Sequence, residues 1–223
     1  CSRFMKDAVL LMGFNRPDLL RQVIDGVRVA GPPRVYLAVD GPRAGRTGEA
    51  QAVDETRSLA STLDWGCEVT TLFQDANLGC GEGVSTAISW FFTHEERGII
   101  LEDDILADPT FFPYCEELLD RYEDDERVFA VSGCNYVPRA AVSRPQDAYR
   151  FSRVPHIWGW ATWRRSWSRH RLDISGWRDQ LPPRRLFEVS GRSALGADHQ
   201  GVCFEQIRRH RTAAGGRDER PRI

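Results

Sequence analysis

Residues 98–104 read GIILEDD, a short apolar run that ends at three consecutive carboxylates. Residues 99–101 are apolar at every position, which is typical of a central strand buried on both faces. The acids then follow at the carboxyl end of that strand, where open α/β sheets bind ligands. Asp108-Pro109 indicates a helix start, with Asp108 as the N-cap and Pro109 at the first helical position. We therefore expect the acids in a short loop between a buried strand and a helix.

Four further runs of strand length alternate with helical patterns along the chain. They cover residues 8–12, 35–39, 68–73 and 128–133, and Pro17 marks the start of the first helix. Five strands alternating with helices predict an α/β fold with a mainly parallel, Rossmann-like central sheet flanked by helices. The 223 residues, 41% hydrophobic and 28% charged, are enough for a single domain with a sizeable core.

Composition excludes several classes of protein. Lys and Arg number 30 against 32 Asp and Glu, so nothing suggests a nucleic-acid partner. The chain has no apolar run of about 18 residues, which a transmembrane segment needs, and no signal-peptide pattern. Its six cysteines form no C-x-x-C pair, which argues against zinc and for reduced thiols. We therefore expect a cytoplasmic protein without a transmembrane segment.

The acidic stretch and its surroundings resemble the GT-A glycosyltransferases, and most closely N-acetylglucosaminyltransferase I and related bacterial family 2 enzymes. The segments that look like the acidic (DxD-type) motif and downstream helix of that family are residues 101–109, Phe111-Phe112 and Cys134-Asn135. The resemblance implies a Rossmann-like GT-A fold, with a nucleotide-sugar-binding half over residues 1–135 and an acceptor-side half over residues 136–223. It covers residues 8–169 well and the remainder weakly, which indicates a truncated or divergent C-terminal part.

This resemblance implies roles for the acids. Asp104 would bind Mn²⁺ or Mg²⁺, which are hard cations that prefer oxygen ligands. Glu102 and Asp103 would contact the ribose, the sugar or metal-bound water. The metal would neutralise the charge that builds on the leaving diphosphate.

Residues after the first two strands are implied to border the nucleotide base and ribose of the donor. They are Phe14, Asn15, Arg16 and Asp40. Read from the residues alone, Asn15 is an equally good helix cap, and Asp40-Gly41 is an ordinary turn signal. The Gly-rich segment 77–83 lacks the Lys-Ser/Thr ending of a P-loop and the G-x-G-x-x-G spacing. Glu82 stands where the family commonly has a basic residue, so we expect no direct diphosphate contact from this segment.

Five of the seven tryptophans lie between residues 158 and 177. Trp160, Trp163 and Trp167 have helical spacing, and we expect the last two to face the core. Trp158-Gly159-Trp160 resembles the segment that lines the acceptor pocket in the family. A tryptophan face stacks well on the C–H surface of a sugar, and Gly159 allows close backbone approach.

Asp198 matches the catalytic base of the family, which takes the proton from the acceptor hydroxyl. An ordinary surface Asp is a comparable alternative, and His199 or Glu205 are substitutes for the role. A base opposite the leaving diphosphate gives one in-line displacement and therefore inversion at the anomeric carbon.

The expected function is a metal-dependent, inverting hexosyl- or N-acetylhexosaminyltransferase. It would move a sugar from a nucleotide diphosphate sugar, by resemblance a UDP-sugar, to a hydroxyl of a glycan or small-molecule acceptor. One alternative is a sugar-phosphate nucleotidyltransferase, although residues 13–17 do not supply the Gly-rich, basic loop that such an enzyme normally has. The other is a catalytically inactive nucleotide-sugar-binding module.

Overall fold

A computed structural model of the chain describes residues 5–136, 148–153, 155–173 and 202–206, the last of these as backbone only. The strands are β1 (Ala8–Gly13), β2 (Arg34–Val39), β3 (Glu68–Phe73), β4 (Arg97–Glu102), β5 (Val128–Ser132), β6 (Tyr149–Ser152), β7 (Trp160–Trp163) and β8 (Val202–Gln206). The helices are α1 (Pro17–Ala30), α2 (Glu49–Ser58), the 3-10 turn η1 (Leu59–Thr62), α3 (Gly79–His94), α4 (Phe111–Arg121) and α5 (Arg164–Trp167). Within these residues, no helix is both long and apolar enough to cross a membrane.

The strands form one sheet in the order β3-β2-β1-β4-β7-β5-β8-β6. The first four pair in parallel, so their carboxyl ends meet at one edge of the sheet. β7 runs antiparallel between β4 and β5, while β8 is parallel to β5 and antiparallel to β6. The predicted α/β class, with a mainly parallel sheet between helices, is confirmed.

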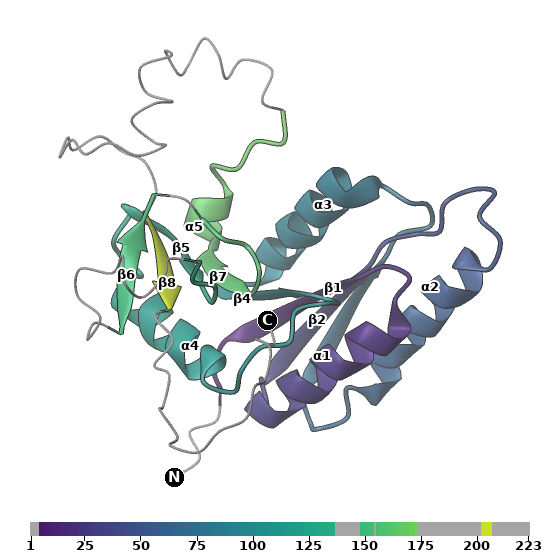
Figure 1. Cartoon of the computed structure of the whole chain (residues 1–223), viewed down its shortest axis with the longest axis horizontal. Coiled ribbons are helices and arrows are strands. Elements are labelled where there is room, and N and C mark those ends of the chain that lie inside the picture. Colours follow the sequence, from purple (N-terminus) through teal and green to yellow (C-terminus); the bar gives the residue numbers. More distant parts are fainter. Residues whose placement is uncertain (1–4, 137–147, 154, 174–201, 207–223) are drawn as a thin grey trace, which may run out of the picture.

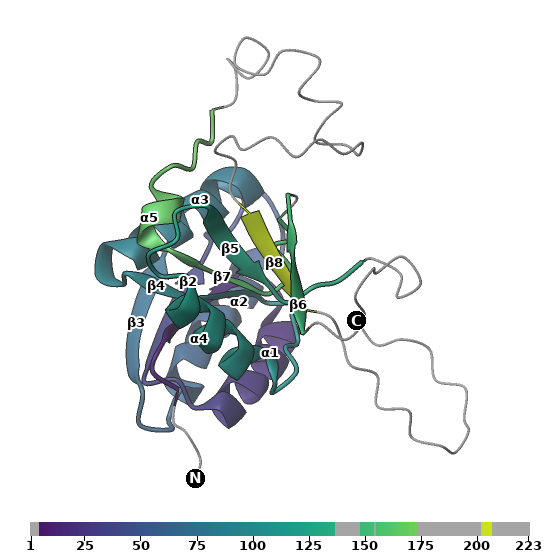
Figure 2. The same cartoon turned by 90° about the vertical axis from the view of Figure 1, so that its left-hand side faces the viewer.

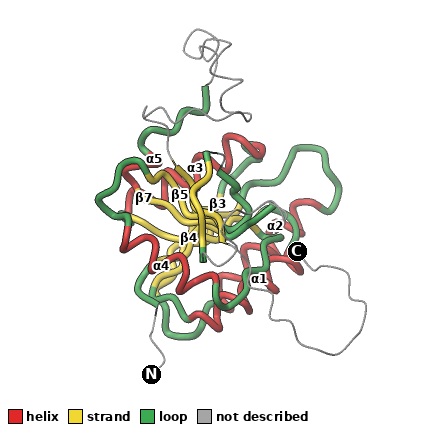
Figure 3. Tube along the Cα trace, turned by 60° about the vertical axis from the view of Figure 1, so that its left-hand side comes forward, coloured by secondary structure: helices red, strands yellow, loops and turns green. Residues whose placement is uncertain are grey.

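Helices cover the parallel part of the sheet on both faces, as Figures 1 and 3 show. Side chains of α1, α2 and α4 form one core cluster with alternate residues of β1, β2 and β4, among them Val9, Leu37 and Ile99. α3 packs on the opposite face against the intervening residues, such as Leu10 and Ile100. Because successive strand residues point to opposite faces, β1, β2 and β4 must be apolar throughout, which explains their continuous apolar runs. Figure 2 shows β5, β7 and β8 beside this part.

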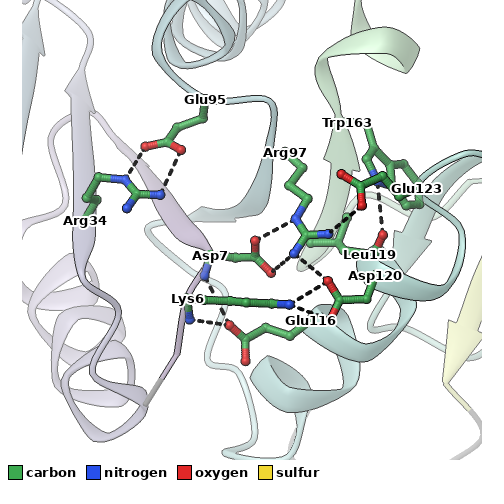
Figure 4. A network of polar contacts seen from close by, with 10 residues as sticks. All are labelled: Lys6, Asp7, Arg34, Glu95, Arg97, Glu116, Leu119, Asp120, Glu123 and Trp163. Atoms are coloured by element: carbon green, nitrogen blue, oxygen red, sulfur yellow. Dashed lines mark hydrogen bonds and ion pairs between the residues drawn. The ribbon is translucent and has the colours of Figure 1, made fainter. Parts of the chain in front are cut away.

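A polar network ties β1, β4 and α4 together at the opposite edge of the sheet (Figure 4). Arg97 donates hydrogen bonds from Nε to Asp7 (2.8 Å) and from Nη2 to Asp120 (2.7 Å). The backbone N–H groups of Lys6 and Asp7 donate to Glu116, at 2.6 and 3.1 Å. The start of β4 is thus fixed by charge pairing, while its other end carries the three acids.

The predicted start of the helix after the acids is wrong by two residues. The carboxylate of Asp108 accepts a hydrogen bond from the backbone N–H of Thr110 (2.9 Å), which closes a turn instead of capping a helix. The N-cap residue is Thr110, so α4 begins at Phe111 rather than at Pro109.

The predicted helical placement of Trp160 and Trp163 is also wrong. Both residues lie in β7, which forms ladders with β4 and β5. Trp160 packs with the α3 cluster and Trp163 with the α1 cluster, on opposite faces of the sheet. The prediction that Trp163 is a core residue is confirmed, and Trp167 in α5 is half-buried against the α3 cluster. Pairing with two neighbouring strands therefore outweighs the helical spacing.

Candidate functional site

A cavity of about 350 Å³ lies at the carboxyl edge of the parallel strands. Its apolar lining includes Met12 from β1, Ala38 from β2 and Ala87 from α3, and Phe14 stands beside them. The polar lining comprises Arg16, Asp40, Arg43, Gln74, Asn77, Glu102 and Asp103. This volume falls in the range of small-molecule sites, and apolar walls with a few converging polar groups are their usual composition.

Arg16 binds two of the three acids in the loop after β4. Its Nε and Nη2 donate to the two carboxylate oxygens of Asp103, the former at 3.2 Å, and its Nη1 donates to Asp104 (3.0 Å). The side chain of Asp103 is only 3% exposed, whereas those of Arg16 and Asp104 are close to half exposed. Every guanidinium nitrogen of Arg16 is therefore engaged by a carboxylate. Sequence reasoning expected this residue beside the donor nucleotide and did not foresee its pairing with the acids.

Burial shifts the pKa values of Glu102 and Asp103. It raises the pKa of Glu102, and repulsion from Asp104 and Asp103 raises it further. Burial also raises the pKa of Asp103, although the adjacent Arg16 guanidinium opposes that rise. Arg16 lowers the pKa of both acids, but among the described residues it donates hydrogen bonds to Asp103 and none to Glu102.

The acids offer the oxygen atoms that Mn²⁺ and Mg²⁺ prefer, and in this conformation two of them are held by Arg16. Across the described residues, no group of three or more His, Cys, Asp or Glu side chains is placed to hold a metal ion. Arg16 already occupies both oxygens of Asp103 and one of Asp104. A divalent cation can bind the carboxylate of Asp103 only if Arg16 moves away from it.

Glu49, the first residue of α2, connects the loop after β1 to the loop after β2. It accepts hydrogen bonds from the side-chain amide of Asn15 (3.2 Å) and from the backbone N–H of Arg43 (2.7 Å). Asn15 is therefore not the cap of α1, whose N-cap residue is Arg16 without a side-chain hydrogen bond. The alternative interpretation of Asn15 as a helix cap is wrong.

Arg43 is a cavity residue that the sequence analysis missed. Its Nε lies 3.1 and 3.0 Å from the two oxygens of Glu49, its Nη2 also binds Glu49, and its guanidinium carbon lies 5.3 Å from the ring centroid of Phe14. Glu49 is 8% exposed, and the hydrogen bonds from Arg43 lower its pKa to about 2. One feature of the sequence could have identified Arg43 as a site residue: it is a basic residue three positions after Asp40, and Asp40 directly follows a predicted strand.

Asp40 joins the end of β2 to the start of α3. Its Oδ1 accepts from the backbone N–H groups of Gly41 (2.8 Å) and Leu78 (3.0 Å), and its Oδ2 accepts from Asn77 Nδ2 (2.9 Å). A Cβ at Gly83 would lie 3.2 Å from Asp40 Oδ2, so glycine there makes room for the carboxylate. The Gly-rich segment is thus mostly the first turns of α3, packed on Asp40.

The three predicted acceptor residues do not form one surface. Trp158 is 49% exposed and contacts Tyr136 edge-on, with 5.9 Å between ring centroids. Trp160 is 6% exposed and lies in the core. Between them, Gly159 adopts φ 71° and is buried, with its carbonyl accepting from Gly133 N–H (2.8 Å). Tyr136 also contacts His156, with 4.8 Å between ring centroids.

The predicted catalytic base and its first substitute lie outside the described residues. These are Asp198 and His199. Glu205 falls within β8, which joins the sheet between β5 and β6. The assignment of a base therefore remains a prediction.

Comparison with known proteins yields architectural similarity alone. No protein-family model matches the chain, and no curated protein does. Among solved structures, Rv0371c from Mycobacterium tuberculosis H37Rv is 13% identical with a TM-score of 0.44, over 82% of this chain and 86% of that chain. A 4-diphosphocytidyl-2C-methyl-D-erythritol synthase from Anaerococcus prevotii is 10% identical with a TM-score of 0.45, over 78% and 84%.

The glycosyltransferase GlyE from Streptococcus pneumoniae TIGR4, in its apo form, is 11% identical with a TM-score of 0.37. The match covers 88% of this chain but only 41% of the GlyE chain. Identities this low and TM-scores below 0.5 assign no function. The proposal below therefore depends on the residues of the chain itself.

Proposed function

We propose that this chain is a glycosyltransferase that takes a sugar from a nucleotide diphosphate sugar, a UDP-sugar by resemblance, and transfers it to an acceptor hydroxyl. The observation that carries the proposal is the cavity at the carboxyl edge of β1, β2 and β4, with apolar walls beside two arginines and an acidic loop. Apolar walls suit a base and ribose, and arginines suit a diphosphate. The acids after β4 agree with the motif on which the resemblance depends.

Residues on three loops bind the donor in this proposal. Phe14 packs against the base or ribose, and Asp40 accepts a hydrogen bond from either of them. Asp40 Oδ2 has room for this bond, because it accepts only one from the described residues and a carboxylate oxygen can accept two. Asn15 acts through Glu49, which holds the loop. Glu102 and Asp103 contact the ribose or the sugar, and Arg16 lies beside them.

A divalent cation, Mn²⁺ or Mg²⁺, is part of the proposal and Asp104 is its expected ligand. Asp104 is 45% exposed, and its second oxygen makes no hydrogen bond to the described residues. This oxygen is open to the cation, whereas Asp103 becomes available only when Arg16 releases it. When bound, such a cation supplies Lewis-acid stabilisation of the leaving diphosphate. Without it, Arg16 holds the acidic loop and offsets part of the negative charge of the three acids.

The acceptor is proposed to bind near Trp158, whose exposed ring offers a stacking face for a glycan or a small hydroxyl compound. Trp160 is a core residue and supports this part of the chain from within the α3 cluster. Asp198 is proposed to take the acceptor proton, which predicts inversion at the anomeric carbon. Retention of the donor configuration in the product would contradict the role of Asp198.

A thermal-shift screen tests donor binding. UDP, GDP, CDP and dTDP are each added with and without Mn²⁺ to the wild type, to Asp104→Ala and to the control Asp25→Ala, which changes an exposed residue of α1. Nucleotide at about 100 times its Kd stabilises the fold by about 2.7 kcal/mol, or roughly 5–11 °C for a domain of this size. We expect a shift with one nucleotide and metal in the wild type and in Asp25→Ala, and its loss in Asp104→Ala.

Absence of a shift with all four nucleotides would contradict the proposal. A second assay follows release of sugar from UDP-glucose and UDP-N-acetylglucosamine, with product configuration read by NMR. Donor binding without sugar release or transfer would favour the inactive binding module instead.

A further inference from the structure

Arg43 lies in the loop between β2 and α2, yet it lines the same cavity as the start of α3. The α3 residues that share the cavity include Gly79, Cys80 and Gly83. The α3 residues that line the cavity are all uncharged, and Glu82, at the position where the resembled family commonly has a basic residue, is exposed and does not line it. Arg43 therefore brings a positive charge to a cavity whose α3 residues offer a diphosphate only neutral groups.

The two arginines of the cavity differ in what they can still bind. All three guanidinium nitrogens of Arg16 donate to Asp103 or Asp104. Arg43 donates from Nε and Nη2 to Glu49, and its Nη1 makes no hydrogen bond to any residue that the structure describes. Of the two, Arg43 therefore keeps a charged donor available for a ligand.

Its neighbours hold that donor in a fixed direction. A guanidinium is planar, so engaging Nε and Nη2 on Glu49 determines where Nη1 points. The ring of Phe14, 5.3 Å away, supports the same group. Glu49 itself is 8% exposed and anchored at the start of α2. A donor that is already oriented loses less side-chain freedom when a ligand binds.

We propose that Arg43 binds the anionic diphosphate of the nucleotide donor through Nη1, supplying the positive charge that the start of α3 lacks. This inference rests on the proposed function, because it assigns a ligand to the same cavity. The ligand class is a nucleoside diphosphate, with or without an attached sugar. The diphosphate, rather than the base, is the group that Arg43 recognises.

Titration calorimetry on the full chain tests the inference by comparing each diphosphate with its nucleoside. UDP, GDP, CDP and dTDP are paired with uridine, guanosine, cytidine and thymidine, and the pair that the wild type binds best is used. The variants are Arg43→Ala and, as a second form that keeps a polar side chain, Arg43→Gln. Arg46→Ala is the matched control, because Arg46 is an exposed arginine of the same loop that does not line the cavity.

We expect both Arg43 variants to bind the diphosphate about 10-fold or more weakly and the nucleoside within about 2-fold of wild type. A hydrogen bond between charged groups is worth at least such a factor. Arg46→Ala should match the wild type for both ligands. Urea unfolding of each variant checks that the fold is retained.

Two results would overturn the inference. Either Arg43→Ala and Arg43→Gln bind the diphosphate as the wild type does, or they weaken the diphosphate and the nucleoside equally, which would make Arg43 a support for the loop. In both cases the wild type still binds nucleotide, so the proposed function survives. Failure of the wild type to bind any of the four diphosphates is a different outcome and contradicts the proposed function itself.

Discussion

Substitution of Arg97 by Ala removes the centre of the polar network at the start of β4 (Figure 4). The Arg97 side chain is 14% exposed and its partner Asp7 is 6% exposed. Without Arg97, the carboxylates of Asp7, Glu116 and Asp120 face one another with only Lys6 nearby. Breaking a buried ion pair by removing one partner costs about 3–5 kcal/mol, and the residual exposure of Arg97 favours the lower figure. We expect about 3 kcal/mol, which corresponds to a loss of roughly 6–12 °C in Tm.

The loss of stability in Arg97→Ala should depend on pH. Burial raises the pKa of Asp7 in the folded protein, and Arg97 is the main group that opposes this rise. In the variant the pKa of Asp7 is higher still, so the folded state binds a proton more tightly than the unfolded state does. Lowering the pH from 7.5 through that pKa then stabilises the folded variant relative to its state at pH 7.5. The difference from the wild type should therefore shrink as the pH falls towards about 4.

Urea unfolding at pH 7.5 and pH 5 measures both effects. Arg169→Ala is the matched control, because the ion pair of Arg169 with Glu126 is more than half exposed on both sides and should contribute less than about 1 kcal/mol. The double variant Asp7→Asn/Arg97→Ala should recover much of the loss, since the unpaired buried charge is gone. A loss in Arg97→Ala no larger than in the control, or one that is equal at both pH values, would refute the reasoning.

Four further predictions concern the helices and the cavity. Gly26→Ala in α1 should raise the free energy of unfolding by about 0.5–1 kcal/mol, because a Cβ there meets nothing within 4 Å and alanine favours a helix. Gly41→Ala should lower the free energy of unfolding, because its Cβ would lie 2.4 Å from the backbone of Ala76, and it should weaken nucleotide binding, because Gly41 N–H donates to Asp40 at the cavity. Thermal unfolding checks both glycine variants, and calorimetry checks binding by Gly41→Ala. The pKa of Glu49 is lowered to about 2, so its carboxylate should stabilise the fold above about pH 4.5 and lose this contribution as the pH falls towards 2. The difference in unfolding midpoint between the wild type and Glu49→Gln should therefore close over that pH range. Cys80, an exposed thiol at the cavity, should be alkylated more slowly when the donor nucleotide is bound, as peptide mapping by mass spectrometry would show; equal rates would place the nucleotide elsewhere.

Local sequence pattern determined the order of the elements and the position of the acids. The runs at residues 8–12, 35–39 and 99–101 are apolar because helices cover both faces of the sheet, and each became a central strand. Since parallel strands end at one edge, the residues that follow them had to gather there. Phe14, Arg16, Asp40, Glu102 and Asp103 all line the cavity, which is as much of the candidate site as such a pattern can predict.

Contacts between distant residues decided the rest. Trp160 lies in a strand because β7 pairs with β4 on one side and β5 on the other. The residues next to Trp160 in the sequence do not indicate that these two strands will lie beside it. Arg16 reached Asp103, 87 positions away, and Arg43 was turned into the cavity by Glu49 and Phe14. A charge at a loop position pairs with whichever opposite charge the fold brings within hydrogen-bonding distance. The sequence therefore determined which charges reach this edge of the sheet, and the tertiary structure alone decided which of their hydrogen-bonding groups are paired within the described residues.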